Sequence, residues 1–197
     1  MERVHYGPLT ARKAPKALGY QQPSSFTSVA VDSPAISVMT DLRQVSAATI
    51  AGDASLSDAA RMMMARNVRL LLVIGADQMV VGLISALDTQ GERPIQWLHD
   101  RGGKYADLRV GDLMIAAQDI DILELKDVLF AEVGHIVATL KAWGRQHALV
   151  AERDSSTGAT LIRGIFSATQ IGRQLGVAVQ PFDVANTFAE IERTLAG

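Results

Sequence analysis

Residues 69–88, RLLLVIGADQMVVGLISALD, contain two short apolar runs separated by turn residues. The runs, 70–74 and 79–84, are rich in Leu, Ile and Val, which favours two strands of a hairpin. Because neither run alternates with polar residues, both strands are expected to be covered on both faces. The hairpin leads directly into Ser85 and Asp88, whose Ser-x-x-acid spacing is typical of the first turn of a helix.

A second copy of this arrangement occurs later in the chain. Residues 148–151 form an apolar run, residues 154–158 form a polar turn, and a further apolar run leads to Ser167. Gly-Leu-Ile-Ser closes the strand of the first copy and Gly-Ile-Phe-Ser closes that of the second. The sequence therefore contains an internal repeat.

A helix is predicted before each hairpin. Residues 56–66 follow Ser55, a good N-cap, and carry an apolar stripe at helical spacing. Residues 133–143 repeat the stripe and end at Gly144. The three methionines at 62–64 are interpreted as core packing rather than as an adaptable binding surface. Each repeat thus has the order strand–helix–strand–strand–helix, and the two are expected to share a core because neither is large enough to be comfortably stable alone.

The repeat divides the chain into four parts and predicts a mixed α/β (α+β) fold class with two β-α-β-β-α repeats. Residues 1–35, interrupted by four prolines, are expected to form an N-terminal extension that is either flexible or docks on a partner. The first repeat is placed at 36–104 and the second at 105–180. An amphipathic helix is predicted within 181–197.

Composition argues against several classes of protein. A formal net charge of −2 gives no signal for nucleic-acid or membrane-surface binding, and the absence of cysteine excludes disulfides and thiolate metal sites. No apolar stretch is long enough for a membrane span, and the first residues lack a signal-peptide core, so a cytoplasmic location is expected. The four histidines are scattered, and the sequence has no Walker A motif, no Gly-x-Gly-x-x-Gly after a strand, no His-Glu-x-x-His and no Gly-x-Ser-x-Gly. A non-catalytic protein with no required cofactor or metal is predicted.

Several segments together resemble the CBS (cystathionine β-synthase) domain, and their duplication resembles the tandem pair called a Bateman module. The resemblance covers 36–180 and is carried by the segments 36–40, 55–60, 67–74 and 82–88. Residues 91–95, GERPI, are similar to a subgroup of small stand-alone bacterial CBS-pair proteins. The resemblance implies pseudo-two-fold packing of the repeats, clefts between them that often bind adenine nucleotides, and pairing into homodimers.

The resemblance also implies which residues contact a nucleotide. Ser85 and Asp88 would contact phosphate and ribose, since a carboxylate can accept both ribose hydroxyls and a helix start suits a phosphate. The alternative is that these two residues only cap a helix. The other contacts carried over from the family are Arg69, Leu70, Thr49, Ala54, His147 and Ser167. For Arg69 the alternative is a strand-end arginine that reaches solvent, and for His147 it is a packed core histidine.

The sequence departs from the family pattern at several positions. Gln170 stands where the family has Asp, and an amide brings no charge. The pocket around Ser167 and Gln170 is therefore expected to bind weakly or to stay empty, and one site that uses Asp88 is favoured over two. Leu72 and Leu149 occupy positions where the family often has Pro.

The leading functional hypothesis is a regulatory module that senses AMP, ADP, ATP or an NAD-type ligand in the cleft between its repeats. A regulated protein partner would read the resulting change in packing. The alternative is a ligand-free structural module that dimerises and docks on a partner through the N-terminal extension or the C-terminal helix. Neither hypothesis involves nucleic acid or a membrane.

Overall fold

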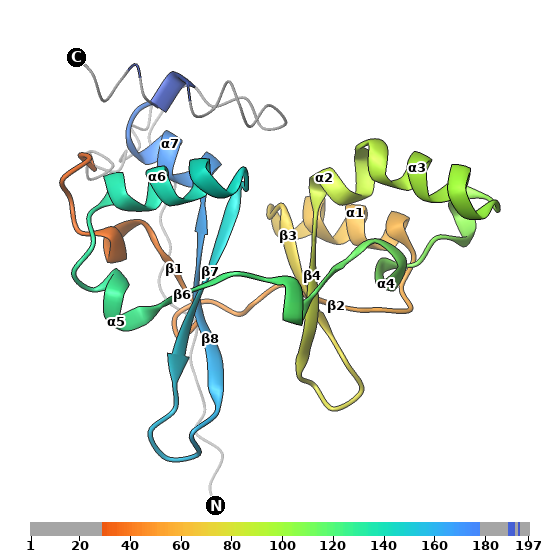
Figure 1. Ribbon diagram of the computed structural model, residues 1–197, viewed down its shortest axis with the longest axis horizontal. Helices are drawn as coiled ribbons and strands as arrows, with labels where there is room; N and C mark the ends of the chain where they lie inside the picture. Colours follow the sequence, from red (N-terminus) through yellow and green to blue (C-terminus); the bar gives the residue numbers. More distant parts are fainter. Residues whose placement is uncertain (1–28, 178–188, 192, 194–197) are drawn as a thin grey trace, which may run out of the picture.

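The computed structural model describes residues 29–177, 189–191 and 193. Two four-stranded sheets lie side by side, with most of the helices toward one end of the sheets and the tips of two hairpins at the other (Figure 1). The mixed fold class predicted from the repeat is confirmed. Residues 1–28 of the predicted extension and most of the predicted helix at 181–197 lie outside the described residues, although 189–191 are helical.

The first sheet has the order β2-β3-β4-β5. Its strands are β2 (Thr49–Ala51), β3 (Leu70–Ile74), β4 (Val80–Ser85) and β5 (Ile115–Ala116). β2 and β3 are parallel and the other pairs are antiparallel. The helices of this half are α1 (Leu56–Arg66), α2 (Ala86–Gln90), α3 (Glu92–Arg101), η2 (Tyr105–Asp107) and α4 (Val110–Leu113).

The second sheet has the order β1-β8-β7-β6. Its strands are β1 (Thr40–Asp41), β6 (Ile122–Glu124), β7 (His147–Arg153) and β8 (Thr160–Ser167). Again one pair, β6 with β7, is parallel and the others are antiparallel. The helices are η1 (Ala35–Val38), η3 (Ala117–Asp119), α5 (Leu125–Val128), α6 (Val133–Trp143) and α7 (Ala168–Gln174).

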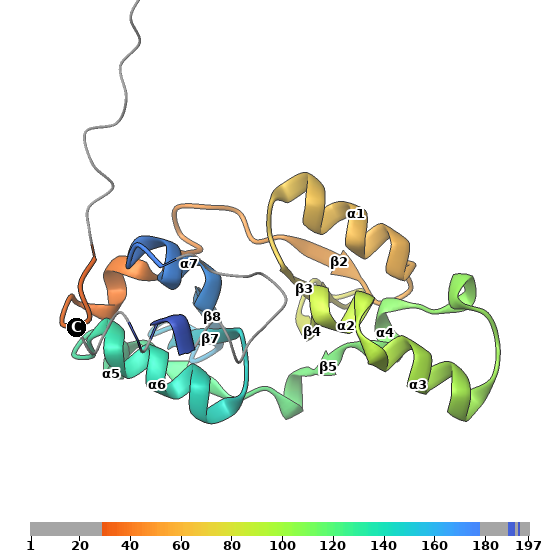
Figure 2. The same ribbon diagram turned by 90° about the horizontal axis from the view of Figure 1, so that it is seen from above.

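The two halves exchange their leading segments. β1 precedes the first repeat in the chain but pairs with β8, and β5 opens the second repeat but pairs with β4. The exchange continues outside the strands, where Ala35 donates its N–H to the carbonyl of Ala131 and Val110 donates to that of Ala54. Figure 2 shows the two connections by which the chain crosses from one half to the other. Each half is therefore completed by residues that belong, in sequence, to the other repeat.

The helix boundaries follow from local chemistry. The Ser55 hydroxyl accepts the N–H of Asp58 at the start of α1, and Asn67 ends the helix in the left-handed conformation with φ of 51°. Gly144 ends α6 in the same conformation, with φ of 61°. Both helices have the bounds that the sequence predicts. Capping residues mark both ends of α1 and the C-terminal end of α6, where the apolar stripe stops.

β3 is buried on both faces, as its unbroken apolar run predicts, whereas the second run of the hairpin is exposed at Met79 and Val81. Leu71 and Val73 on one face of β3 pack into the helix-covered core of the first half. Leu70 and Leu72 on the other face pack with Leu149 of β7 in a separate cluster. This cluster, which we call the seam, joins the two sheets. Leu72 and Leu149, at positions where the family often has Pro, are both buried in the seam.

Candidate functional site

A cleft with a volume of about 510 Å³ opens where the two halves meet. The first half contributes the end of α1, the start of β3 and part of α2. The second half contributes the start of β7, the end of β8, α7 and Thr40 of β1. The lining residues include Met63, Met64, Val68, Arg69, Leu70, Ala86, His147, Ile165, Ser167, Thr169, Gln170 and Arg173. This volume lies in the range of small-molecule sites.

The structure brings four of the predicted site residues to this cleft: Arg69, Leu70, His147 and Ser167. Arg69 immediately precedes β3, and His147 begins β7, the corresponding strand of the second half. Both side chains lie on the wall because the parallel arrangement of the repeats places these two strand starts at the same end of the seam. Ser167 is the last residue of β8, pairs with His147 across the sheet and also lines the cleft.

The cleft is positively charged. Arg69 and Arg173 line it from opposite halves, and none of its described lining residues is Asp or Glu. Burial, and then the positive charge of Arg173, lower the pKa of the Arg69 guanidinium. Burial and the charge of Arg69 also lower the pKa of His147 to about 4, although Asp88 acts in the opposite direction. His147 is therefore neutral at pH 7 and offers one donor and one acceptor.

The second half of the cleft carries polar groups rather than a carboxylate. Gln170 uses its amide oxygen to accept a hydrogen bond from the Thr40 hydroxyl at 3.1 Å. Thr40 reaches this position because β1 is exchanged onto β8, where it pairs with Ile165. The Ser167 and Thr169 side chains line the same wall.

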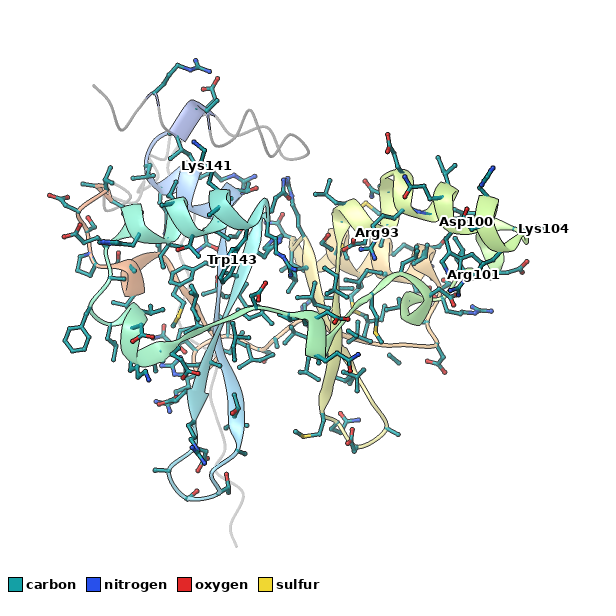
Figure 3. The ribbon with its side chains drawn as sticks, viewed as in Figure 1. Arg93, Asp100, Arg101, Lys104, Lys141 and Trp143 are labelled. Atoms are coloured by element: carbon teal, nitrogen blue, oxygen red, sulfur yellow. The ribbon has the colours of Figure 1, made fainter. Side chains whose placement is uncertain are left out.

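Ser85 and Asp88 do not line this cleft. Asp88 is buried, and one of its oxygens accepts the Ser85 N–H at 2.8 Å and the Ser85 hydroxyl at 2.7 Å. The other oxygen forms an ion pair with Arg93 on the first turn of α3. Figure 3 shows Arg93 in the half built from the first repeat, on the same helix as Asp100 and Arg101. Asp88 thus caps α2 and closes the contact between α2 and α3.

Thr49 and Ala54 lie apart from the other predicted residues. They line a second, more open hollow between β2 and α1, together with Asp58, Arg61 and Met62. Asp58 and Arg61 form an ion pair with each other across one turn of α1. The structure therefore separates the predicted set into residues of the cleft, residues of this hollow, and the Ser85–Asp88 cap.

Sequence reasoning missed two contributors to the cleft. Arg173 follows Gln170 by three residues, so it faces the same side of α7, but a basic residue in the last turn of a short helix reads as ordinary. The methionines at 62–64 were predicted to be core, which is wrong for two of them. Met63 is buried, whereas Met62 and Met64 are exposed, and Met64 lines the cleft.

Two further features are absent from the described part of the chain, a metal site and a membrane-spanning helix. Within residues 29–177, 189–191 and 193, no group of three or more His, Asp or Glu side chains is placed to hold a metal ion. No helix in these ranges is long and apolar enough to cross a membrane.

Two strand-exchanged α/β repeats with a ligand-sized cleft at their seam define a tandem-repeat module. Residues 35–88 match the family model of the CBS domain, the family that the sequence of this part of the chain resembles. No curated protein sequence matches the chain.

Solved structures show that the fold extends over both repeats. An uncharacterised conserved protein from Pyrococcus horikoshii has a TM-score of 0.53 at 20% identity, covering 77% of this chain and 98% of its own. A CBS-domain protein from Agrobacterium tumefaciens has a TM-score of 0.50 at 15% identity, covering 70% and 93%. CBSX2 from Arabidopsis thaliana, solved in complex with AMP, has a TM-score of 0.50 at 20% identity, covering 72% and 94%. The chain therefore has the fold of a CBS-domain pair.

Proposed function

We propose that this protein is a non-catalytic regulatory module that senses an adenine nucleotide in the cleft at the seam. The observation that carries the proposal is the composition of the cleft, which combines apolar and cationic walls. Met64 and Val68 offer apolar surface for a base. Arg69 and Arg173 offer charge for phosphate, and the Ser167 hydroxyl also lines the cleft. The AMP complex of CBSX2, a protein of the same fold, supports the same class of ligand.

Arg69, Leu70, His147 and Ser167 are the contacts proposed for this cleft. The proposal includes a homodimer in the cytoplasm and a regulated protein partner. Ligand would alter the packing of the repeats or of the dimer, and it can shift such an equilibrium only by binding one state more tightly than the other. Because the cleft draws one wall from each half, a bound ligand contacts both repeats and is well placed to prefer one arrangement.

A ligand-free interaction module is the second candidate. One observation favours it: the carboxylate of Asp88, which the family resemblance assigns to ribose, is buried and already holds Ser85 and Arg93. A site at Asp88 would require Arg93 to move away. This observation argues against nucleotide binding at Asp88 and leaves the open cleft as the site to be tested.

The test is a thermal-shift and calorimetric screen with AMP, ADP, ATP, NAD and S-adenosylmethionine. A ligand at about 100 times its dissociation constant stabilises the folded state by roughly 2.7 kcal/mol, which raises the Tm by several degrees in a chain of this size. Ala60→Phe fills the cleft and should abolish the shift. Ala65→Phe on the same helix, which faces the second hollow, is the matched control and should retain it.

If no nucleotide shifts the Tm or gives a binding signal, and the protein still unfolds cooperatively, the interaction module would be favoured. Asp88→Ala is a poor test of binding, because loss of its carboxylate also removes the partners of Ser85 and Arg93. A lost response in that variant would not distinguish a binding residue from a structural one.

A further inference from the structure

The arginines of the cleft come from different repeats. Arg69 lies just before β3 in the first half, and Arg173 lies in the last turn of α7 in the second half. The ion pairs formed among the described residues do not include Arg173. A positive charge therefore faces the cleft from each side of the seam, with no acidic side chain in its described lining.

The two guanidinium groups are close enough to affect each other. The charge of Arg173 is one cause of the lowered pKa of Arg69, the other being burial. Like charges that approach across a partly buried gap repel each other, and an anion between them removes the repulsion and adds charge-assisted hydrogen bonds. The cleft is thus suited to an anionic group placed between the two halves.

The described lining of this cleft contains no carboxylate that could bind the hydroxyls of a ribose. Two vicinal hydroxyls are best held by a carboxylate, which accepts both hydrogen bonds. Gln170 stands at the position equivalent to Asp88, and its amide oxygen already accepts from Thr40. Asp88 itself is buried outside the cleft lining, where it holds Ser85 and Arg93.

We propose that Arg69 and Arg173 form an anion clamp across the seam, and that this clamp selects the ligand by its phosphate charge rather than by its ribose hydroxyls. The inference rests on the proposed function and narrows it. ADP and ATP should bind more tightly than AMP, and adenosine and the cationic S-adenosylmethionine should bind weakly. Removal of the 2′-hydroxyl should have little effect. Because one arginine comes from each repeat, the phosphate is also the group through which the ligand joins the repeats.

The experiment uses the full chain and isothermal titration calorimetry with ADP, 2′-deoxy-ADP, adenosine and inorganic pyrophosphate. We expect 2′-deoxy-ADP to bind within about threefold of ADP, and Arg173→Gln to weaken both by about tenfold or more, equivalent to about 1.4 kcal/mol per factor of ten. Arg173→Lys keeps the charge and should restore most of the affinity. Arg153→Gln removes the same charge from the hairpin tip, outside the cleft lining, and should change little.

A second readout concerns the empty cleft. Arg173 is exposed, so Arg173→Gln should fold, and it should melt at the same temperature as the parent chain or higher because the repulsion with Arg69 is gone. Pyrophosphate should raise the Tm of the parent chain and of Arg153→Gln but not that of Arg173→Gln.

The possible failures can be distinguished. If ADP binds but loses tenfold without its 2′-hydroxyl, or binds equally to Arg173→Gln, the clamp is wrong and the nucleotide sensor stands. If pyrophosphate binds through Arg173 but no adenine nucleotide binds more tightly than it does, the clamp stands and the adenine sensor is wrong. If neither pyrophosphate nor any nucleotide binds, both are wrong.

Discussion

At the scale of single residues, His147 connects the chemistry of the cleft to the stability of the fold. Its ring lies on the cleft wall, near Arg69 and within the field of Asp88. Burial and the charge of Arg69 hold its pKa at about 4, against an ordinary value of 6.5. The folded protein therefore binds fewer protons than the unfolded chain between these two values.

Acidification should destabilise the protein across this window. Because the unfolded state takes up the proton first, the free energy of unfolding should fall as the pH drops from 6.5 to about 4, by at most about 3 kcal/mol from this group. His147→Gln should flatten this slope, and His99→Gln, a change at an exposed histidine of α3, should not. Urea unfolding at several pH values measures both. An unchanged slope in His147→Gln would contradict the assignment.

The carboxylates with lowered pKa values affect the free energy of unfolding at a lower pH than His147 does. Asp41 is shifted mainly by its hydrogen bond to Arg163, and Asp58 by its bond to Ser55. The hydroxyl of Ser156 is the main cause of a pKa of about 2 for Asp154. The stabilisation from these groups is present above their ordinary value of 3.8 and is lost as the pH falls below it.

The sequence predicts some residues of the candidate site and not others for physical reasons. Arg69 and His147 can be found because each is a polar residue at the start of an apolar strand. The burial of Asp88 cannot be found from its motif, since it depends on the turn at Gly91 that brings Arg93 back over α2. Arg173 cannot be found either, because the cleft that it lines exists only when the two halves pack together.

At the scale of elements, two glycines allow the exchanged segments to pack closely against the strands that they join. Gly82 in β4 and Gly164 in β8 occupy equivalent positions in the two repeats. A Cβ on Gly82 would lie 2.5 Å from the backbone oxygen of Ile115 in β5. A Cβ on Gly164 would instead meet the side chain of Met39, including its Cε at 2.7 Å. A backbone carbonyl in a strand cannot move aside as a methionine side chain can.

These contacts predict a difference between two matched variants. Gly82→Ala should push β5 from the first sheet and destabilise the protein by roughly 1–3 kcal/mol, in the range of overpacked sites. Gly164→Ala should be destabilised less, because Met39 can change rotamer. Denaturant unfolding of the two variants beside the parent chain provides the comparison. A larger loss of stability in Gly164→Ala would show that Met39 is fixed in place.

Elements that are specified by residues close together in the sequence can be predicted, whereas elements that depend on pairing with distant residues cannot. α1 and α6 are specified by caps and stripes within a dozen residues, and their bounds are predicted correctly. The hairpins are also predicted locally, from two apolar runs separated by turn residues. β1 and β5 are two residues long and exist only through pairing with the other repeat, so no local pattern indicates them. Residues 123–130 contain the end of β6 followed directly by α5.

At the scale of the whole molecule, the exchange means that a repeat of the sequence and a half of the folded protein do not contain the same residues. The core of the first half includes Leu108, Val110 and Leu113, all of which follow residue 104. A fragment 36–104, cut at the predicted boundaries, lacks these residues and β5. A fragment 48–116 of equal length contains the whole of this core.

We therefore expect the two fragments to behave differently. The fragment 48–116 should unfold cooperatively in urea, although its exposed seam residues make it less stable than the full chain. The fragment 36–104 should show little cooperative structure, because the gap left by three buried side chains removes several kcal/mol from a domain that is already small. Circular dichroism and amide chemical-shift dispersion would measure the difference. Equal cooperativity of the two fragments would mean that α4 and β5 are dispensable.

The exchanged strand β1 also determines when this protein can finish folding during its synthesis. Asp41 finds its partner Arg163 122 residues later in the chain. A ribosome that adds about 5–20 residues per second takes roughly 6–24 s to produce that partner. During this time β1 has no strand to pair with, although the first repeat has already been synthesised. The waiting strand is short and polar, which makes it a poor template for association with other nascent chains. Completion of the second sheet is therefore a late event, and codon-level changes in elongation speed between the repeats should alter the yield of folded protein without altering its sequence.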